Sequence, residues 1–150
     1  MGQPPARRLS ATSATAGPHR FDVLVIGGGP AGAAAAYWLA TAGHDVLVVE
    51  RKVFPRDKTC GDGLTPRAVH QLDEMGLSDQ LARYHRYGGL RAVAHGRSIE
   101  MTWPDHPVFP SRGYVVRRCD LDQFVAQHAV DAGAALWTGA EALAPIVRDG

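Results

Sequence analysis

The chain has 150 residues, of which 45% are hydrophobic and 21% are charged, and its formal net charge is +1. This length corresponds to about one domain with a buried core. The balanced charge gives no electrostatic case for a nucleic-acid partner, two cysteines exclude a disulfide-rich scaffold, and no apolar run reaches the ~18 residues of a membrane span.

The first fifty residues predict a tail followed by a strand, a helix and a second strand. Residues 1–20 are rich in Ala, Ser, Thr, Pro and Arg without apolar periodicity, which predicts a disordered tail. Residues 21–27, FDVLVIG, form a continuous β-branched run that is typical of a strand buried on both faces of a parallel sheet. The alanine-rich segment 28–43 favours a helix that Gly43 ends, and 44–50, HDVLVVE, is a second strand. Together they predict one βαβ unit.

The middle of the chain predicts shorter elements. An irregular charged loop over 51–64 comes first, and a helix over 65–76 comes after it, with Thr65 as N-cap and Pro66 at its first position. A shorter helix over 78–87 is capped by Ser78. The remaining elements are a hairpin over 90–103 that turns near Gly96 and Arg97, a proline-rich connection over 104–112, and a strand over 113–117.

The last part of the chain predicts a helix that is followed by two strands. Residues 120–134 favour an amphipathic helix with Asp120 as its N-cap. A strand over 135–140 comes next, and another is predicted to start at 142 and to reach a turn at the end of the chain.

The strongest local motif is GGGPAG over residues 27–32, which matches G-x-G-x-x-G directly between a predicted strand and a predicted helix. Such a loop lets the backbone approach a pyrophosphate, and the helix after it supplies free N–H groups and a positive dipole. The alternative is a tight turn that binds no ligand. The candidate cofactor-binding residues in this motif are Gly27, Gly29, Pro30, Ala31 and Gly32.

Glu50 ends the second predicted strand, eighteen positions after Gly32. A carboxylate at this place can accept hydrogen bonds from the ribose hydroxyls of a dinucleotide, and it disfavours a 2′-phosphate. The alternative is a solvent-exposed acid at the end of a strand. These motifs by themselves do not separate FAD from NAD.

Two longer segments resemble a known family. Residues 22–51, which end in Glu50 and Arg51, resemble the FAD fingerprint of the glutathione-reductase-like flavoproteins. Residues 55–69, PRDKTCGDGLTPRAV, are similar to the Cys-Gly-x-Gly segment of the geranylgeranyl reductase family, closest to its actinobacterial members that reduce the menaquinone side chain. The motif Arg118-x-x-Leu-Asp is similar to the family's Arg-x-x-Phe-Asp, with leucine for the commoner aromatic residue, and the neighbouring Arg117 leaves the matching arginine open.

The resemblance implies an α/β fold, a Rossmann-like FAD-binding domain of the glutathione-reductase and aromatic-hydroxylase type. It also implies the start of an interleaved β-rich substrate domain. Residues 21–150 are therefore expected to form the N-terminal part of the FAD-binding domain, as a fragment of a longer chain. Within this part, about 88–116 are expected to belong to the substrate region. A fragment of this kind is expected to bind FAD weakly and to be inactive by itself.

The resemblance also implies site residues. Cys60, Gly61, Asp62 and Gly63 are expected to lie against the flavin, and Arg118 to pair with a phosphate or ribose of the cofactor. Cys60 is in addition a candidate catalytic residue, with a small packing residue as the alternative. Seven histidines without ligand spacing predict no metal site.

The implied function is an FAD-dependent oxidoreductase that reduces an isoprenoid C=C bond of a prenyl lipid, a menaquinone side chain or a geranylgeranyl group, by hydride transfer from reduced flavin. Its partners are then the prenyl lipid and an unidentified electron donor. We expect a cytoplasmic protein with peripheral contact at the inner face of the membrane, and no nucleic-acid partner. The alternatives are a flavin monooxygenase or halogenase, and a non-catalytic dinucleotide-binding module.

Overall fold

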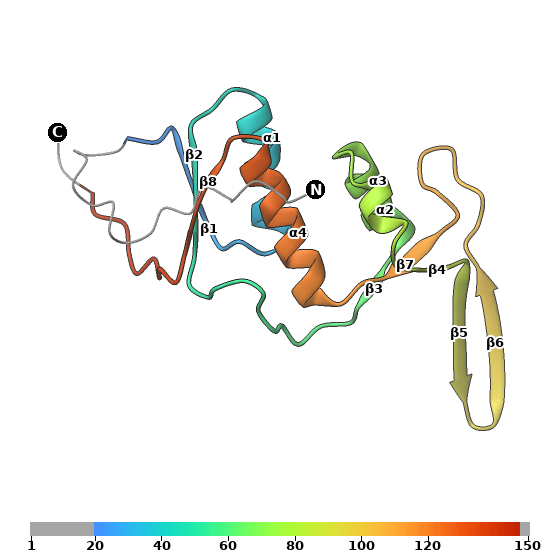
Figure 1. Ribbon diagram of the computed structural model, residues 1–150. Coiled ribbons are helices and arrows are strands. Elements are labelled where there is room, and N and C mark those ends of the chain that lie inside the picture. The colour runs from blue at the N-terminus through green and yellow to red at the C-terminus, as the bar shows by residue number, and fades with distance from the viewer. Residues whose placement is uncertain (1–19, 148–150) are drawn as a thin grey trace. The chain divides into compact units, whose positions relative to one another are not determined.

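The structure is a computed structural model that describes residues 20–147. The disordered tail predicted over 1–20 and the predicted terminal turn therefore lie outside the described residues, apart from Arg20. The chain divides into two compact units (Figure 1), one formed by the residues up to Lys58 together with those from Cys119 onward, and one formed by Thr59–Arg118.

The first unit is built on a parallel sheet. Its strands are β1 (Val23–Ile26), β2 (Val46–Glu50) and β8 (Ala135–Thr138), in the order β1-β2-β8. Val25 pairs with Val48, and Val48 pairs with Leu136. The β-branched residues of these strands suit a pleated surface that is packed on by helices. The predicted βαβ unit and the later strand are confirmed.

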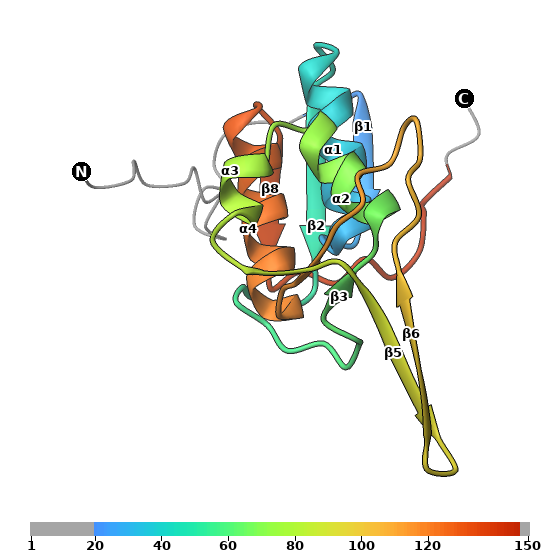
Figure 2. The same cartoon turned by 90° about the vertical axis from the view of Figure 1, so that its right-hand side faces the viewer.

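Two helices cover one face of this sheet, α1 (Pro30–Thr41) and α4 (Arg118–Asp131), as Figures 1 and 2 show. The core that they share with the sheet is made of Ala36, Val46, Val48, Ala129 and Ala134. The small alanines let the helices approach the strands closely. Gly43 comes after α1 with φ +91°, a conformation that ends a helix at little cost for glycine, as predicted.

The opposite face of the sheet is exposed in the structure. Leu24, Ile26 and Trp137 point to this side, since their neighbours in each strand face the helices, and all three are exposed. The prediction that the first strand is buried on both faces is therefore wrong, because both helices pack on the same face.

The second unit combines a small antiparallel sheet with two helices. Strands β3 (Gly63–Leu64), β7 (Gly113–Val115) and β4 (His85–Tyr87) lie in the order β3-β7-β4, and α2 (Pro66–Glu74) and α3 (Ser78–Leu81) connect β3 to β4. The buried apolar residues of this unit are Val69, Leu72, Met75, Leu77, Leu81, Tyr114 and Val116.

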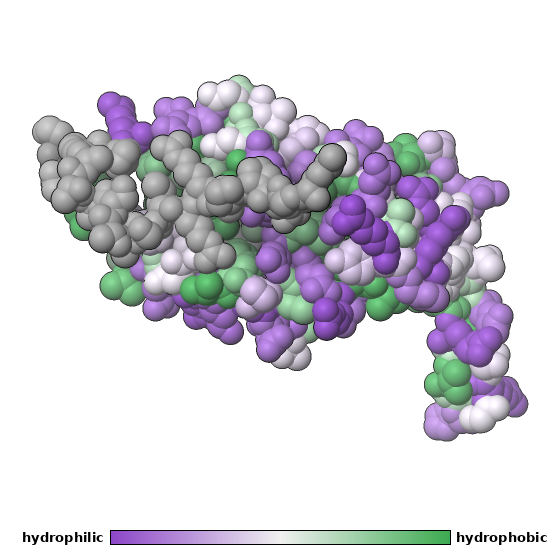
Figure 3. All heavy atoms as spheres, in the orientation of Figure 1, coloured by the Kyte–Doolittle hydropathy of each residue, from purple (hydrophilic) through white to green (hydrophobic). Residues whose placement is uncertain are grey.

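A hairpin extends from the same unit. Strands β5 (Gly89–Ala94) and β6 (Arg97–Thr102) pair in antiparallel fashion and turn at His95 and Gly96, both with positive φ. The predicted hairpin is confirmed, with its turn one residue earlier. Figure 3 shows hydrophobic side chains on its surface between hydrophilic ones, and Val93 and Ile99 are among the exposed residues.

Four predicted boundaries need correction. The loop after β2 ends before residue 63, because β3 pairs with β7. The helix predicted over 78–87 ends at Leu81, because β4 pairs with β7, and Ser78 is its first helical residue and not its cap.

The other two corrections concern the last helix and the segment after β8. Asp120 lies inside the first turn of α4 and is not its cap, because the helix begins at Arg118. The strand predicted from 142 is absent from the described residues 142–147, which have no strand partner there. No described helix has the length and apolar character needed to cross a membrane.

Candidate functional site

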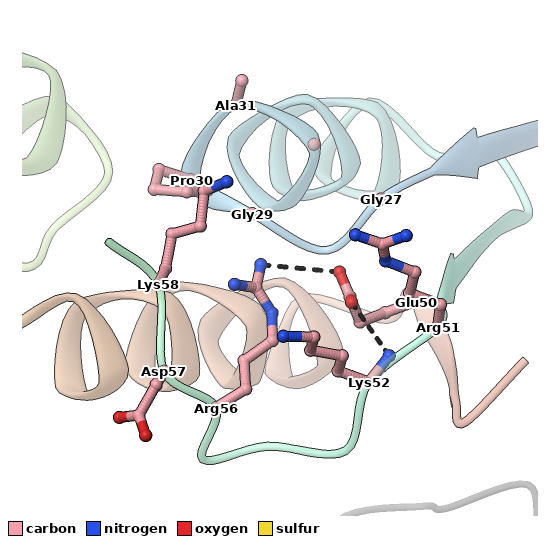
Figure 4. Close-up of a pocket in the computed structure, with 11 residues that line it drawn as sticks. Gly27, Gly29, Pro30, Ala31, Glu50, Arg51, Lys52, Arg56, Asp57 and Lys58 are labelled. Atoms are coloured by element: carbon pink, nitrogen blue, oxygen red, sulfur yellow. Dashed lines mark hydrogen bonds and ion pairs between the residues drawn. The ribbon is translucent and has the colours of Figure 1, made fainter. Parts of the chain in front are cut away.

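A pocket of about 390 Å³ lies in the first unit where β1 and β2 end and α1 begins (Figure 4). Clefts of this size are typical of small-molecule sites, and the carboxyl ends of parallel strands are where α/β sheets bind their ligands. The residues that line it are Gly27, Gly29, Pro30, Ala31, Gly32, Glu50, Arg51, Lys52, Arg56, Asp57 and Lys58. The structure thus brings together the five candidate residues of the glycine loop and the two candidates at the end of β2, Glu50 and Arg51.

The glycine loop is shaped for close backbone approach. Gly27 has φ +97°, which disfavours any other residue, and a Cβ on Gly32 would lie 2.0 Å from the carbonyl oxygen of Gly27. Gly29 is the N-cap of α1 in extended conformation, and no side chain caps the helix. The first N–H groups of α1 are therefore available to an anion at the start of the helix.

Glu50 is buried beside this loop, with only 6% of its surface exposed. Its Oε2 accepts a hydrogen bond from the N–H of Gly28 at 2.9 Å, and its Oε1 accepts one from the N–H of Lys52 at 3.0 Å. The carboxylate is thus fixed to the backbone on both sides. The alternative of a solvent-exposed acid at the strand end is wrong, because Glu50 turns back onto the glycine loop.

These contacts set the protonation of Glu50. Burial alone raises the pKa of its carboxyl, but the N–H groups of Lys52 and Gly28 and the guanidinium groups of Arg56 and Arg51 outweigh it. The pKa of Glu50 is therefore below its ordinary value, and the group is a carboxylate at neutral pH. An ionised carboxylate is the form that accepts hydrogen bonds from ribose hydroxyls.

Arg56 completes the site from the loop that comes after β2. Its Nη2 lies 3.5 Å from Glu50 Oε2, its Nη1 lies 3.1 Å from Asp122 Oδ2, and its guanidinium stands 5.3 Å from the centre of the Phe54 ring. The Arg56 side chain is only 10% exposed, and its Nε is buried without a hydrogen-bond partner among residues 20–147. A buried donor without an acceptor is costly in a folded protein, so the described residues satisfy the hydrogen-bonding groups of Arg56 only in part.

These residues fit the diphosphate and ribose of a dinucleotide. The glycine loop permits close approach, the start of α1 offers N–H groups, Glu50 offers a carboxylate and Arg56 a positive charge. Three further cations, Arg51, Lys52 and Lys58, line the same pocket and are exposed, so they favour an anionic ligand.

The segment with Cys60 belongs to the second unit. Cys60 is exposed with a free thiol, and no atom lies within 4 Å of a Cβ built on Gly61. The Asp62 carboxylate accepts the backbone N–H of Arg118 at 3.1 Å, and the Asp62 carbonyl accepts the N–H of Val116 at 2.8 Å. The structure thus brings Asp62 and Arg118 together at the start of α4. Contact of Cys60–Gly63 or Arg118 with a flavin stays a prediction.

Sequence reasoning missed that Arg56 lines the pocket and that Asp122 forms an ion pair with Arg56. The sequence signal for this pair is weak, since Arg56 comes six positions after Glu50 in an irregular loop, and Asp122 is the last residue of the Arg-x-x-Leu-Asp motif. Among residues 20–147, no group of three or more His, Cys, Asp or Glu side chains is placed to hold a metal ion.

A protein family and several curated proteins are similar to this chain. A family model described as an FAD binding domain matches residues 20–149. A menaquinone reductase of Mycobacterium tuberculosis is 52% identical over 82% of this chain and 30% of its own length. A digeranylgeranylglycerophospholipid reductase of Methanopyrus kandleri is 32% identical over 87% of this chain and 32% of its own length.

Solved structures share the fold. A myxobacterial FAD-dependent chondrochloren halogenase superposes with a TM-score of 0.71 at 30% identity, over 81% of this chain and 29% of that protein. A geranylgeranyl bacteriochlorophyll reductase-like protein of Thermoplasma acidophilum gives a TM-score of 0.69 at 30% identity, over 87% of this chain and 32% of its own. The chain thus spans about a third of the length of these relatives.

Proposed function

The chain belongs to the FAD-binding domain family, and from this premise we propose that it is the FAD-binding part of an oxidoreductase that reduces an isoprenoid C=C bond of a prenyl lipid. The observation that carries the proposal is the 52% identity to a menaquinone reductase. A reductase of a digeranylgeranyl lipid is also among the relatives. The two substrates named differ in their head groups and share an isoprenoid chain, which is therefore the proposed target.

The residues of the pocket suit the adenosine half of FAD. We assign the diphosphate to the 27–32 loop and the first turn of α1, the ribose hydroxyls to Glu50, and the balancing positive charge to Arg51 and Arg56. When bound and reduced, FAD would supply a hydride for one carbon of the double bond, and a proton from water would complete the saturation at the other carbon. The chain's own residues bind and orient the cofactor for this step.

The second unit is assigned to the flavin and the lipid. In this proposal Cys60, Gly61, Asp62 and Gly63 contact the flavin ring, Cys60 takes part in the reaction, and Arg118 pairs with the cofactor. Residues of about 88–116 belong to the substrate region, and residues 21–150 form the N-terminal part of the FAD-binding domain. In this proposal the protein meets its lipid substrate at the cytoplasmic face of the membrane and receives electrons from a donor still to be identified.

A second candidate function is oxygen-dependent hydroxylation or halogenation. The halogenase superposition at a TM-score of 0.71 favours it, because that enzyme shares the fold at 30% identity. The resemblance of the Cys60 segment to prenyl reductases weighs against it. A dinucleotide-binding module without catalysis is the third candidate.

The cofactor is tested on the chain of 150 residues. We expect weak, reversible FAD binding by flavin fluorescence, and loss of most FAD on gel filtration. Stoichiometric FAD that stays bound through the column would contradict the expected weakness, and NAD binding without FAD binding would favour the non-catalytic module.

The substrate is tested in a chimera, in which residues 20–147 replace the matching segment of the Mycobacterium tuberculosis menaquinone reductase. With reduced flavin and without oxygen, the chimera is expected to add two hydrogen atoms to the menaquinone side chain, measured by mass spectrometry. Product that forms only with oxygen, and that carries an added oxygen atom or halogen, would support the second candidate instead.

A further inference from the structure

One carboxylate behind the pocket has no role in the proposed FAD site as assigned so far. Asp122, in α4, is fully buried with 0% of its surface exposed, and it is not among the residues that line the pocket. Its Oδ2 lies 3.1 Å from Nη1 of Arg56, which does line the pocket. Burying a carboxylate is costly unless a charged partner compensates it, and Arg56 is such a partner for Asp122.

The two carboxylates share the guanidinium of Arg56 unequally. The distance from Nη1 to Asp122 is 3.1 Å, and the distance from Nη2 to Glu50 Oε2 is 3.5 Å. Asp122 is thus the closer anchor. A guanidinium without this anchor is free to turn toward Glu50 and to form the bidentate pair that arginine and carboxylate prefer.

That turn would occupy the carboxylate that the ribose needs. Each carboxylate oxygen has about two acceptor positions. Glu50 Oε2 accepts from Gly28 N–H and lies near Arg56 Nη2, whereas among residues 20–147 Glu50 Oε1 accepts only from Lys52 N–H. A position on Oε1 therefore remains for a ribose hydroxyl as long as Arg56 stays on the Oε2 side.

The same anchor keeps Arg56 beside the glycine loop. A Cβ built on Gly29 would lie 3.6 Å from Arg56 Nη2, so the guanidinium stands next to the residue whose missing side chain opens the loop. Its Nε is a buried donor without a partner in the described part of the chain. The held arginine thus keeps its positive charge next to the place assigned to the diphosphate.

We propose that Asp122 is a positioning residue of the FAD site, which holds Arg56 away from Oε1 of Glu50 and so keeps the ribose-binding carboxylate and the diphosphate-binding loop ready at the same time. This inference rests on the proposed FAD site. It assigns the acidic end of the Arg-x-x-Leu-Asp motif to the adenosine half of the cofactor, although Asp122 itself touches no cofactor.

The test compares the chain with Asp122→Asn, which keeps the shape and removes the charge. Binding of FAD, of ADP and of 2′-deoxy-ADP is measured by titration calorimetry. We expect Asp122→Asn to weaken FAD and ADP binding by about tenfold, the size typical of coupled neighbours. We also expect it to narrow the preference for ADP over 2′-deoxy-ADP, because that preference reports the ribose contact of Glu50.

Asp73→Asn is the matched control. It breaks a carboxylate–arginine pair of the second unit, with Arg112, and leaves the pocket untouched. We expect this variant to bind FAD and ADP as the unchanged chain does.

A double-mutant cycle separates positioning from a merely structural role. In an Arg56→Gln background, Asp122→Asn is expected to cause no further loss of FAD affinity, because Asp122 acts through Arg56. A purely structural Asp122 would weaken binding by the same factor in both backgrounds. If Asp122→Asn alone fails to fold by circular dichroism, the double variant is still measurable, since it contains no unpaired buried charge of this pair.

The outcomes distinguish the two proposals. Equal FAD affinity of Asp122→Asn and the unchanged chain, or an equal loss in both backgrounds, overturns the positioning role and leaves the proposed FAD site intact. A double variant that binds more weakly than Arg56→Gln also overturns it. If the unchanged chain binds neither FAD nor ADP, the proposed FAD site is overturned, and the positioning role of Asp122 is overturned with it.

Discussion

The two units of the molecule treat their charged residues in opposite ways. In the first unit two buried carboxylates, Glu50 and Asp122, share one buried guanidinium beside the pocket. In the second unit the Asp73–Arg112 pair is partly exposed, and the Arg91–Glu100 pair of the hairpin is two-thirds exposed on both side chains. Burying charged groups lowers stability unless they are paired, whereas exposed ion pairs contribute little to stability. The buried charges of the first unit are therefore better explained by ligand binding than by stability.

The glycine loop and the loop of Cys60, the two loops expected to contact the cofactor, differ in how tightly one glycine of each is packed. In the first unit Gly32 packs against the carbonyl of Gly27 so tightly that a Cβ has no room. In the second unit Gly61 has open space around it. The glycine loop is thus a tightly packed turn, whereas the loop of Cys60 owes none of its shape to packing at Gly61.

The largest effect is expected for Gly32→Ala. Its Cβ would lie 2.0 Å from Gly27 O, so the loop must move away from α1. We expect a loss of about 4 kcal/mol in the free energy of unfolding, measured by urea denaturation, and loss of FAD binding. The control Gly61→Ala is expected to change stability by less than about 0.5 kcal/mol. Equal stability of the two variants would show that Gly32 is no more tightly packed than Gly61.

The second largest effect is expected for Leu81→Ala, which creates a cavity in the second unit. Leu81 is fully buried at the end of α3, and Leu81→Ala is expected to cost about 3 kcal/mol. Hydrogen exchange should show the largest loss of protection within Thr59–Arg118. The control is Leu90→Ala on the exposed side of the hairpin, with an expected change below about 0.5 kcal/mol. A comparable loss in the control would show that the hairpin is covered in solution.

The ion pairs of the second unit are expected to matter less. Arg112→Ala removes a partly buried pair with Asp73, and we expect a loss of about 1 kcal/mol by thermal unfolding. Arg91→Ala removes an exposed pair with Glu100 and is expected to cost about 0.3 kcal/mol. Neither variant should alter the affinity for ADP, and a loss of ADP affinity in Arg112→Ala would contradict the assignment of the adenosine half of the cofactor to the first unit.

The smallest expected effects concern pH, and they have opposite signs in the two units. The pKa of Glu50 is lowered in the folded chain, so its contribution to stability is present above the unfolded value of about 4.3 and is lost as the pH falls. Burial raises the pKa of Tyr87, whose hydroxyl donates to Leu64 O at 3.0 Å. Its contribution is therefore present below about pH 10 and is lost as the pH rises.

Two variants test the acid and the alkaline limb of the curve that relates the unfolding free energy to pH. Glu50→Gln is expected to flatten the pH dependence of the unfolding free energy on the acid side only, and Tyr87→Phe on the alkaline side only. Urea denaturation at a series of pH values measures both. An unchanged acid limb in Glu50→Gln would mean that the carboxylate gains nothing from its backbone contacts.

Much of the fold could be predicted because its signals are local. The run of β-branched residues, the glycine loop and the Thr65-Pro66 helix start are each written in a few neighbouring residues, and the structure confirms them. The wrong predictions concern elements whose type or start depends on residues far away in the sequence. Residues 85–87 continue a helical pattern but join a strand, because β7 offers them backbone hydrogen bonds. Ser78 and Asp120 are good capping residues that lie one to three positions inside their helices.

The sequence by itself determined the βαβ unit, the glycine loop and the acid at the end of β2, because each depends on the spacing of nearby residues. Only the tertiary structure decided that Glu50 is buried against the loop, and that Asp122 from a distant helix shares Arg56 with it. No periodicity links a loop residue to a helix residue so far along the chain. Their pairing results from the packing of α4 beside the sheet, which removes both charges from water and makes each depend on its oppositely charged neighbour.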